Sequence, residues 1–206
     1  MPRPRLPVAW LIALCLPLPA AADPLDDLLA ALRRPAPASE AFHEIRHRRA
    51  LKAPLVLSGT LEWRGGEVFV RAVERPYRES SVLEGRTLVV RRGTGPERII
   101  PVARAPELDV LFGGLAALFA GDGEALRRQF TPTLTGAGRW RLTLEPRDPA
   151  LRARIPALVL YGQDDRTRCL LVEQPGARSL TVFGAGPAPQ PLAGPDEEVQ
   201  ALCPQP

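Results

Sequence analysis

The sequence has 206 residues, a length that suits one domain with short appendages and leaves little room for a site shared between two large lobes. Its 27 basic and 23 acidic side chains alternate closely and give a net charge of +4, without the basic block or aromatic-basic stripe of nucleic-acid-binding proteins. The 24 prolines and 17 glycines stay below the share typical of disordered chains, and the 45% hydrophobic content is enough for a core. Nucleic acid is therefore a poor candidate partner.

The first 22 residues have the pattern of a secretory signal peptide. Two arginines precede an apolar stretch at residues 8–18, and the alanines at residues 20–22 provide a small-residue cleavage site after Ala22. The stretch is too short to span a bilayer, and no later segment has about 18 uninterrupted apolar residues. Cys15 leaves open a lipoprotein signal with an acylated cysteine, although Leu14 stands where that signal needs a small residue. We expect an exported, periplasmic protein.

A short helix and a long series of strands follow. Residues 24–34 have leucines at helical spacing, with aspartates in the first turn and arginines in the last, which predicts an amphipathic helix. Beyond residue 37 the apolar pattern has period two, with turn residues between the runs. About eleven strands are predicted, at residues 42–49, 55–63, 68–73, 77–83, 87–91, 98–102, 130–135, 139–145, 155–161, 169–173 and 180–183. They favour a mainly β (α+β) fold with one large antiparallel sheet, apolar on one face.

One segment departs from period two. Residues 106–120 carry apolar side chains on one face of a helix, with Pro106 suited to its first position and Gly121 to its end. Gly113 and Gly114 lie at its centre, where each costs about 1 kcal/mol relative to alanine. The predicted helix is therefore apolar and intrinsically soft. Ordinary core packing and a movable lid over an apolar concavity are both compatible with this pattern.

The motif H-E-x-x-H occurs once, and it is typical of zinc-dependent hydrolases. In that hypothesis His43 and His47 bind zinc and Glu44 acts as the general base. Arginines crowd the motif, the chain has no third histidine, and the same residues alternate well as a strand, in which the one-turn geometry is lost. We favour a solvated strand and keep the hydrolase as an alternative. Because no other catalytic or nucleotide-binding motif is recognisable, we expect neither an enzyme, a metal site nor a cofactor.

The two cysteines that follow the signal peptide lie near the C-terminus. In an oxidising compartment Cys169 and Cys203 are a reasonable disulfide pair, which would stabilise the fold by about 3–4 kcal/mol. The bridge would pin the proline-rich tail at residues 185–206. The alternative is that Cys169 is a small buried side chain and Cys203 a free thiol.

The order and spacing of several short motifs resemble the LolA family of periplasmic lipoprotein carriers, and in particular its divergent LolA-related branch. That branch opens with F-x-E-x-R, then P-L, then S-G-x-L. The matching residues in this sequence are Phe42, Glu44, Arg46, Pro54, Leu55, Ser58, Gly59 and Leu61. The similarity covers roughly residues 24–184. The resemblance also accounts for the H-E-x-x-H motif, which arises by chance because histidines stand beside two residues of F-x-E-x-R.

The resemblance implies a fold, a function and partners. The family fold is an unclosed β-barrel with an apolar concave face covered by a few helices, which we expect at residues 23–184. The family implies a carrier, here expected to be a monomer, that sequesters the acyl chains of a lipoprotein or lipid. It would receive this cargo from an inner-membrane transporter and pass it to an outer-membrane acceptor. In such carriers a strand arginine followed by proline helps to hold the lid, and the resemblance implies Arg64, followed by Gly65, as the counterpart.

Acyl chains are expected to contact the apolar face of the sheet and the helix at residues 106–120. The predicted contacts are Leu55, Leu57, Leu61, Trp63, Leu88, Val90, Leu108, Leu111, Phe112, Leu115, Phe119, Trp140, Leu142 and Leu144. A lipid-sensing regulatory domain that uses the same concavity without transport is a further alternative.

Overall fold

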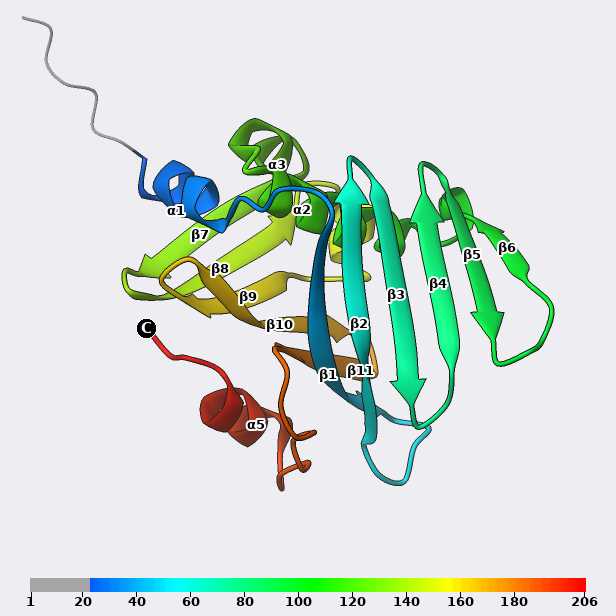
Figure 1. Ribbon diagram of the computed structural model, residues 1–206. Helices are drawn as coiled ribbons and strands as arrows, with labels where there is room; N and C mark the ends of the chain where they lie inside the picture. Colours follow the sequence, from blue (N-terminus) through cyan, green and yellow to red (C-terminus); the bar gives the residue numbers. More distant parts are fainter. Residues whose placement is uncertain (1–22) are drawn as a thin grey trace, which may run out of the picture.

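A computed structural model describes residues 23–206, which form one eleven-stranded antiparallel sheet with helices on both of its faces (Figure 1). The signal peptide expected at residues 1–22 lies outside the described residues. The strands are β1 (Ala38–Arg48), β2 (Leu55–Gly65), β3 (Val68–Arg75), β4 (Glu79–Glu84), β5 (Thr87–Arg92), β6 (Arg98–Pro101), β7 (Phe130–Gly136), β8 (Arg139–Pro146), β9 (Leu158–Gln163), β10 (Arg166–Gln174) and β11 (Ala177–Phe183). The predicted number of strands is confirmed, and most bounds differ from the prediction by a few residues.

The sheet is an unclosed barrel, as predicted. Its strand order is β6-β5-β4-β3-β2-β1-β11-β10-β9-β8-β7, so the first strand lies in the middle and pairs with both β2 and the last strand, β11. Within the described residues β6 and β7 are the two edges and do not pair with each other. Pro101 lies in β6 and Pro132 in β7. Since proline cannot donate a backbone hydrogen bond, both edges are poor templates for a further strand.

Three helices cover the concave face (Figure 1). They are α1 (Pro24–Leu32), α2 (Pro106–Ala120) and α3 (Gly123–Gln129). Helix α2 has the predicted bounds, and it ends at Gly121, whose φ of 67° requires the left-handed conformation that glycine adopts readily. Helix α3 was not predicted from the sequence, although the Asp122 side chain caps it by accepting a hydrogen bond from the Ala125 N–H. The short helices η1 (Val102–Arg104) and α4 (Pro149–Arg152) complete the connections between strands.

The core lies between the concave face and these helices. Alternate side chains of β2 are buried there, including Leu57, Leu61 and Trp63, as the period-two pattern predicts. On β8 the same alternation buries Trp140 and Leu142. The helices add the three leucines of α1 and most apolar side chains of α2, so this core is continuous from one edge of the sheet to the other.

A smaller second core lies on the convex face. Helix α5 (Pro195–Leu202) packs there against β9, β10 and β11, and Val199 is buried against Tyr161 and Leu180 (Figure 1). A disulfide joins Cys169 on β10 to Cys203 directly after α5, as the sequence predicted. The sheet is thus buried on both faces at β9, which explains the uninterrupted apolar run at residues 158–161. Among the described residues, no helix has the length and apolar character needed to cross a membrane.

Candidate functional site

Helix α2 lies closed against one end of the concave face. The ring centroids of Trp63 and Phe119 are 5.6 Å apart, and those of Phe69 and Phe112 are 5.4 Å apart. Phe69 also lies 6.2 Å from Phe119, so the aromatic side chains of β2 and β3 interleave with those of the helix. The segment is therefore both a core element and a cover over the sheet.

Polar contacts tie this cover to its neighbours. The Arg34 N–H donates to the Phe119 carbonyl oxygen at 3.0 Å, which connects the segment after α1 to the C-terminal end of α2. The Arg127 guanidinium on α3 lies 2.7 Å from the Asp26 carboxylate on α1, and this hydrogen bond raises the pKa of Arg127. Because the Arg127–Asp26 ion pair is partly exposed, it contributes little to the free energy of unfolding. Helices α1, α2 and α3 thus form a cover that packing holds more firmly than charge.

An apolar cavity of about 420 Å³ lies between the C-terminal half of α2 and the sheet. Its apolar walls come from α1, β2, α2, β9 and β11. They comprise Leu32, Leu61, Leu115, Leu118, Phe119, Leu160 and Phe183. This volume lies within the range of about 300–1,000 Å³ that is typical of small-ligand sites. At roughly 30 Å³ per water-sized group, it accommodates on the order of a dozen methylenes, the size of one acyl chain.

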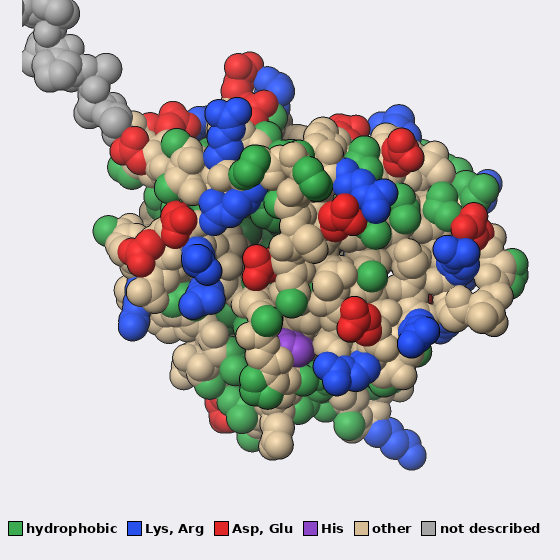
Figure 2. Space-filling model, in the orientation of Figure 1, with side chains coloured by type: hydrophobic (Ala, Val, Ile, Leu, Met, Phe, Trp, Pro, Cys, Tyr) green, Lys and Arg blue, Asp and Glu red, His purple; other side chains and the backbone are tan. Residues whose placement is uncertain are grey.

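The mouth of this cavity is charged. It lies between the segment that joins α1 to β1 and the hairpin that joins β9 to β10. The charged residues that line it are Arg34, Glu40, Asp165, Arg166 and Arg168. Arg34 spans the mouth, because its side chain donates a hydrogen bond to the Asp165 carbonyl oxygen. Basic and acidic side chains lie close together on this part of the surface, below α1 (Figure 2). An apolar interior with a charged rim is the arrangement that an amphiphile requires.

Comparison with protein families identifies the chain. Residues 18–204 match the family described as outer membrane lipoprotein carrier protein LolA-like. The chain belongs to this family. Members of the LolA-like family are periplasmic, and the family is in general not enzymatic. No curated protein matches the chain.

Several solved structures have a similar arrangement of the chain. A LolA superfamily protein from Nitrosomonas europaea is 11% identical and covers 84% of this chain and 94% of its own, with a TM-score of 0.43. A DUF1329 family protein from Desulfovibrio piger is 12% identical over 86% and 96% of the two chains, with a TM-score of 0.41. LprF from Mycobacterium bovis is 11% identical over 83% and 96%, with a TM-score of 0.31. These similarities are too weak to transfer a function to this chain.

The LolA-like cavity uses some of the side chains that the sequence singled out. Leu61, Leu115 and Phe119 line it, whereas the other predicted contacts pack in the surrounding core. The buried side chains among these are Leu57, Trp63, Leu88, Phe112, Trp140, Leu142 and Leu144. The half-buried ones are Leu55, Val90, Leu108 and Leu111. Leu32, Leu118, Leu160 and Phe183 also line the cavity and were not predicted as contacts. Leu160 and Phe183 stand in apolar strand segments, and their orientation could not be assigned without knowledge of the second core.

Arg64 does not lie against the cover. Glu62 stands between the concave-face residues Leu61 and Trp63 and therefore points to the convex face, and Arg64 pairs with Glu62 on that face. The Arg64 Nε donates to Glu62 Oε1 at 3.0 Å, and this hydrogen bond lowers the pKa of Glu62. Within residues 23–206 Arg64 forms its ion pair with Glu62 rather than with the lid. The expected role of Arg64 in holding the lid is therefore wrong for this closed arrangement.

The zinc-hydrolase alternative is also wrong. Its motif lies on strand β1, where His43 and His47 cannot adopt the one-turn geometry of that site. Each histidine instead contacts the C-terminal tail: His43 Nε2 lies 2.9 Å from the Gly186 carbonyl oxygen, and His47 Nε2 lies 2.9 Å from the Glu198 carboxylate. In residues 23–206 no three His, Cys, Asp or Glu side chains are grouped to hold a metal ion. The two histidines therefore dock the tail on the convex face.

The F-x-E-x-R motif forms a charged cluster on the concave face. The buried Glu44 carboxylate lies 2.7 Å from the Arg46 guanidinium and 2.6 Å from that of Arg71 on β3. Arg71 lies over the Phe42 ring, 4.8 Å from its centroid. Each member of the motif thus has a partner, and the buried carboxylate is neutralised by two guanidinium groups. This cluster accounts for the spacing of the motif.

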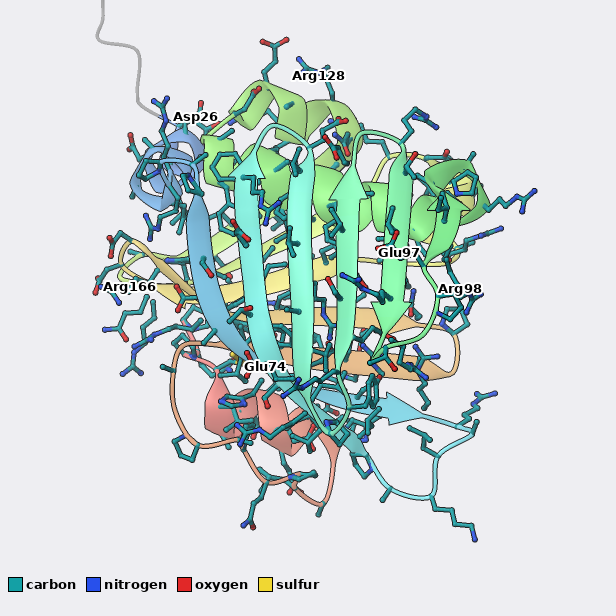
Figure 3. All side chains as sticks on the ribbon, turned by 45° about the vertical axis from the view of Figure 1, so that its right-hand side comes forward. Asp26, Glu74, Glu97, Arg98, Arg128 and Arg166 are labelled. Carbon is teal, nitrogen blue, oxygen red and sulfur yellow. A yellow bond between two sulfur atoms is a disulfide. The ribbon has the colours of Figure 1, made fainter. Side chains whose placement is uncertain are left out.

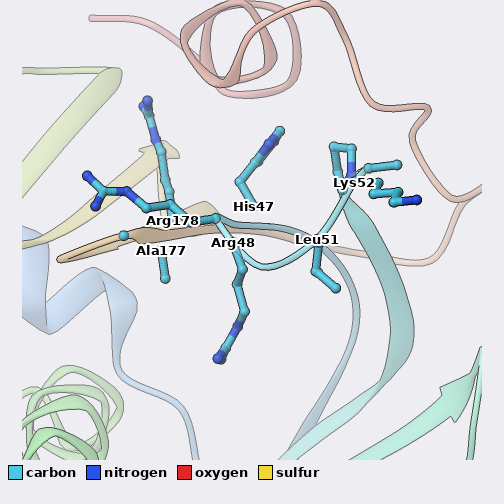
Figure 4. Close-up of a pocket in the computed structure, with 10 residues that line it drawn as sticks. His47, Arg48, Leu51, Lys52, Ala177 and Arg178 are labelled. Carbon is cyan, nitrogen blue, oxygen red and sulfur yellow. The ribbon is translucent and has the colours of Figure 1, made fainter.

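A second depression, of about 380 Å³, lies where β1 and β2 are joined (Figure 4). His47, Arg48, Lys52 and Arg178 line it, together with Leu51. The figure shows these side chains pointing in several directions from β1, from the loop and from β11, rather than into one enclosed space. The depression is more open than the cavity under α2, and basic side chains line it together with small apolar residues such as Ala53 and Pro54.

Proposed function

We propose that this LolA-like protein is a periplasmic carrier that sequesters an acyl chain beneath α2 and passes it toward the outer membrane. The observation that carries the proposal is the cavity of about 420 Å³, which lies between an apolar helix and the concave face of an unclosed barrel. Membership of a family described as outer membrane lipoprotein carriers supports a lipoprotein or lipid as cargo. No covalent chemistry is required of the protein in this function.

The energetics favour binding and still permit release. Burying each methylene is worth about 0.8 kcal/mol, so one chain of a dozen methylenes would gain on the order of 10 kcal/mol before costs. Association and ordering of the chain oppose this gain. Moving α2 away from the sheet would also separate Phe119 from Trp63 and expose both rings. The direction of transfer would come from an inner-membrane donor and an outer-membrane acceptor.

Lipid binding by the purified protein tests this proposal. The mature chain is delipidated, exposed to a membrane lipid extract, isolated again and analysed by mass spectrometry. We expect about one bound acyl chain per protein. In the variant Ala38→Phe the larger side chain would occupy the cavity, which Ala38 lines, and bound lipid should fall at least fivefold. The control is Ala50→Phe in the exposed β1–β2 loop, which should bind lipid like the wild type.

A wild-type protein that retains no lipid would contradict the carrier function. Equal lipid content in wild type and Ala38→Phe would place the bound lipid outside the cavity.

A further inference from the structure

Two arginines of the β9–β10 hairpin lie at the mouth of the cavity. The pairing of β9 with β10 shifts register between Thr167 and Cys169, which is a β-bulge at Arg168. Bulges interrupt the alternation of a strand and re-aim a side chain. Three consecutive residues, Arg166, Thr167 and Arg168, line the cavity next to this bulge. Figure 3 places Arg166 at the end of this hairpin, on the side of α1 and away from Arg98 on β6.

Positive charges outnumber negative charges at the mouth. Arg34 is engaged with Asp165, through a hydrogen bond to the carbonyl oxygen and a carboxylate contact at 4.0 Å. Within the described residues neither Arg166 nor Arg168 forms an ion pair with an acidic side chain. With Glu40 included, three arginines face two carboxylates. The mouth therefore carries an excess positive charge beside an apolar interior.

An amphiphile whose chain lies in the cavity must leave its head group at this mouth. The apolar walls are formed by side chains such as Leu61 and Phe119, whereas the polar groups of the lining gather at the hairpin. Guanidinium groups bind carboxylate and phosphate through paired N–H donors, and the adjoining apolar wall strengthens such contacts by excluding water.

We infer that the cargo carries an anionic head group, a carboxylate or a phosphate, which Arg166 and Arg168 bind while a single alkyl chain occupies the cavity. This inference rests on the proposed carrier function and specifies its substrate class. The volume of about 420 Å³ fits one chain with α2 in place. Arg166 and Arg168 would thus select the head group, and the cavity would select the chain.

A pair of fluorescent probes with the same chain tests the inference. These are cis-parinaric acid, which is anionic, and its uncharged methyl ester. Each is titrated into the wild type, into the double variant Arg166→Gln/Arg168→Gln, and into a control, Arg86→Gln/Arg98→Gln. The control removes the same charge from exposed positions on the β5 and β6 side of the sheet (Figure 3).

We expect the wild type and the control to bind the acid more tightly than the ester. The mouth variant should lose about tenfold in affinity for the acid, the effect of two partly exposed charge-assisted contacts, and less than about twofold for the ester. Added salt should weaken binding of the acid alone. Dodecyl phosphate should displace the acid, whereas inorganic phosphate at the same concentration should not.

The possible failures are distinguishable. If the wild type binds acid and ester equally, or if the mouth variant keeps its preference, the head-group inference is overturned and the carrier function stands. Displacement by inorganic phosphate would reveal a free-anion site and would also overturn the inference. If the wild type binds neither probe, the carrier function itself falls, and the inference falls with it.

Discussion

The indole ring of Trp63 on β2 lies 5.6 Å, centroid to centroid, from the phenyl ring of Phe119 near the C-terminal end of α2. Both side chains were predicted to contact cargo, and in the closed arrangement they contact each other. Phe119 also lines the cavity, so it separates the space for a chain from the aromatic core. This contact should set part of the free energy needed to move α2 off the sheet.

Truncation of Phe119 should therefore loosen the cover. Because the ring is half-buried, Phe119→Ala should lower the free energy of unfolding by about 2 kcal/mol, less than the 3–5 kcal/mol typical of a fully buried phenylalanine. It should also speed uptake of parinaric acid in stopped-flow fluorescence. Ile99→Ala is the control, since Ile99 is 70% exposed on β6 and should change stability by less than about 0.5 kcal/mol. Unchanged uptake in Phe119→Ala would argue against movement of α2.

The two central glycines of α2 should respond differently to alanine. A Cβ at Gly113 would meet the flexible end of the Gln129 side chain, whereas one at Gly114 would lie 3.1 Å from the Phe130 ring. Gly113→Ala should therefore stabilise the protein by up to about 1 kcal/mol, and Gly114→Ala should give no gain or a loss. Urea unfolding compares the two. If α2 must move to admit the probe, a stiffer helix in Gly113→Ala should slow probe uptake. Equal stability of the two variants would contradict the different packing of Gly113 and Gly114.

The disulfide should matter for stability more than for binding. Its two cysteines are 34 residues apart, so the double variant Cys169→Ala/Cys203→Ala should lose about 3–4 kcal/mol of unfolding free energy. The bond lies on the convex face, in the second core, and affinity for an acyl chain should stay within about twofold of the wild type at low temperature. Reduction of the wild type should reproduce the loss. A large loss of affinity in a folded double variant would show that the tail influences the cavity.

The tail is also docked by one buried acid. The fully buried Glu198 carboxylate lies 2.9 Å from His47 Nε2 and accepts a hydrogen bond from the Leu192 N–H at 3.2 Å. Replacement with alanine leaves these polar groups without their acceptor, so Glu198→Ala should cost about 1–3 kcal/mol. The adjacent Glu197 is exposed, and Glu197→Ala should be nearly neutral in the same unfolding experiment. Similar losses in both variants would contradict the docking role.

The fold could be predicted from the sequence because period two is a local signal. Alternation on β2 and β8 depends only on which face is buried, and the same holds for the single apolar face of α2. Gly59 of the S-G-x-L motif shows a different kind of constraint: a Cβ there would lie 1.8 Å from the Ala72 carbonyl oxygen on the next strand. The sequence alone does not show this close approach, which becomes visible only in the pairing of β2 with β3.

The site was harder to predict because it depends on contacts between distant segments. Arg34 and Asp165 meet only after α1 and the β9–β10 hairpin come together, and the bulge at Arg168 has no signature in one sequence. A turn was predicted between the strands at residues 155–161 and 169–173, but Arg166 and Arg168 were not expected at a cavity. Arg64 was misplaced because its role was inferred from a family position rather than from the face of β2 on which it lies.

The location of a bound acyl chain decides whether the cavity under α2 holds the cargo. A fatty acid with a diazirine near its terminal methyl group is bound to the mature protein, activated by light, and mapped by peptide mass spectrometry. We expect labelling of residues 115–119 on α2, or of Leu160 and Phe183 on the sheet, and loss of this labelling in Ala38→Phe. Labelling confined to the basic depression around Leu51, or to the convex face, would contradict it.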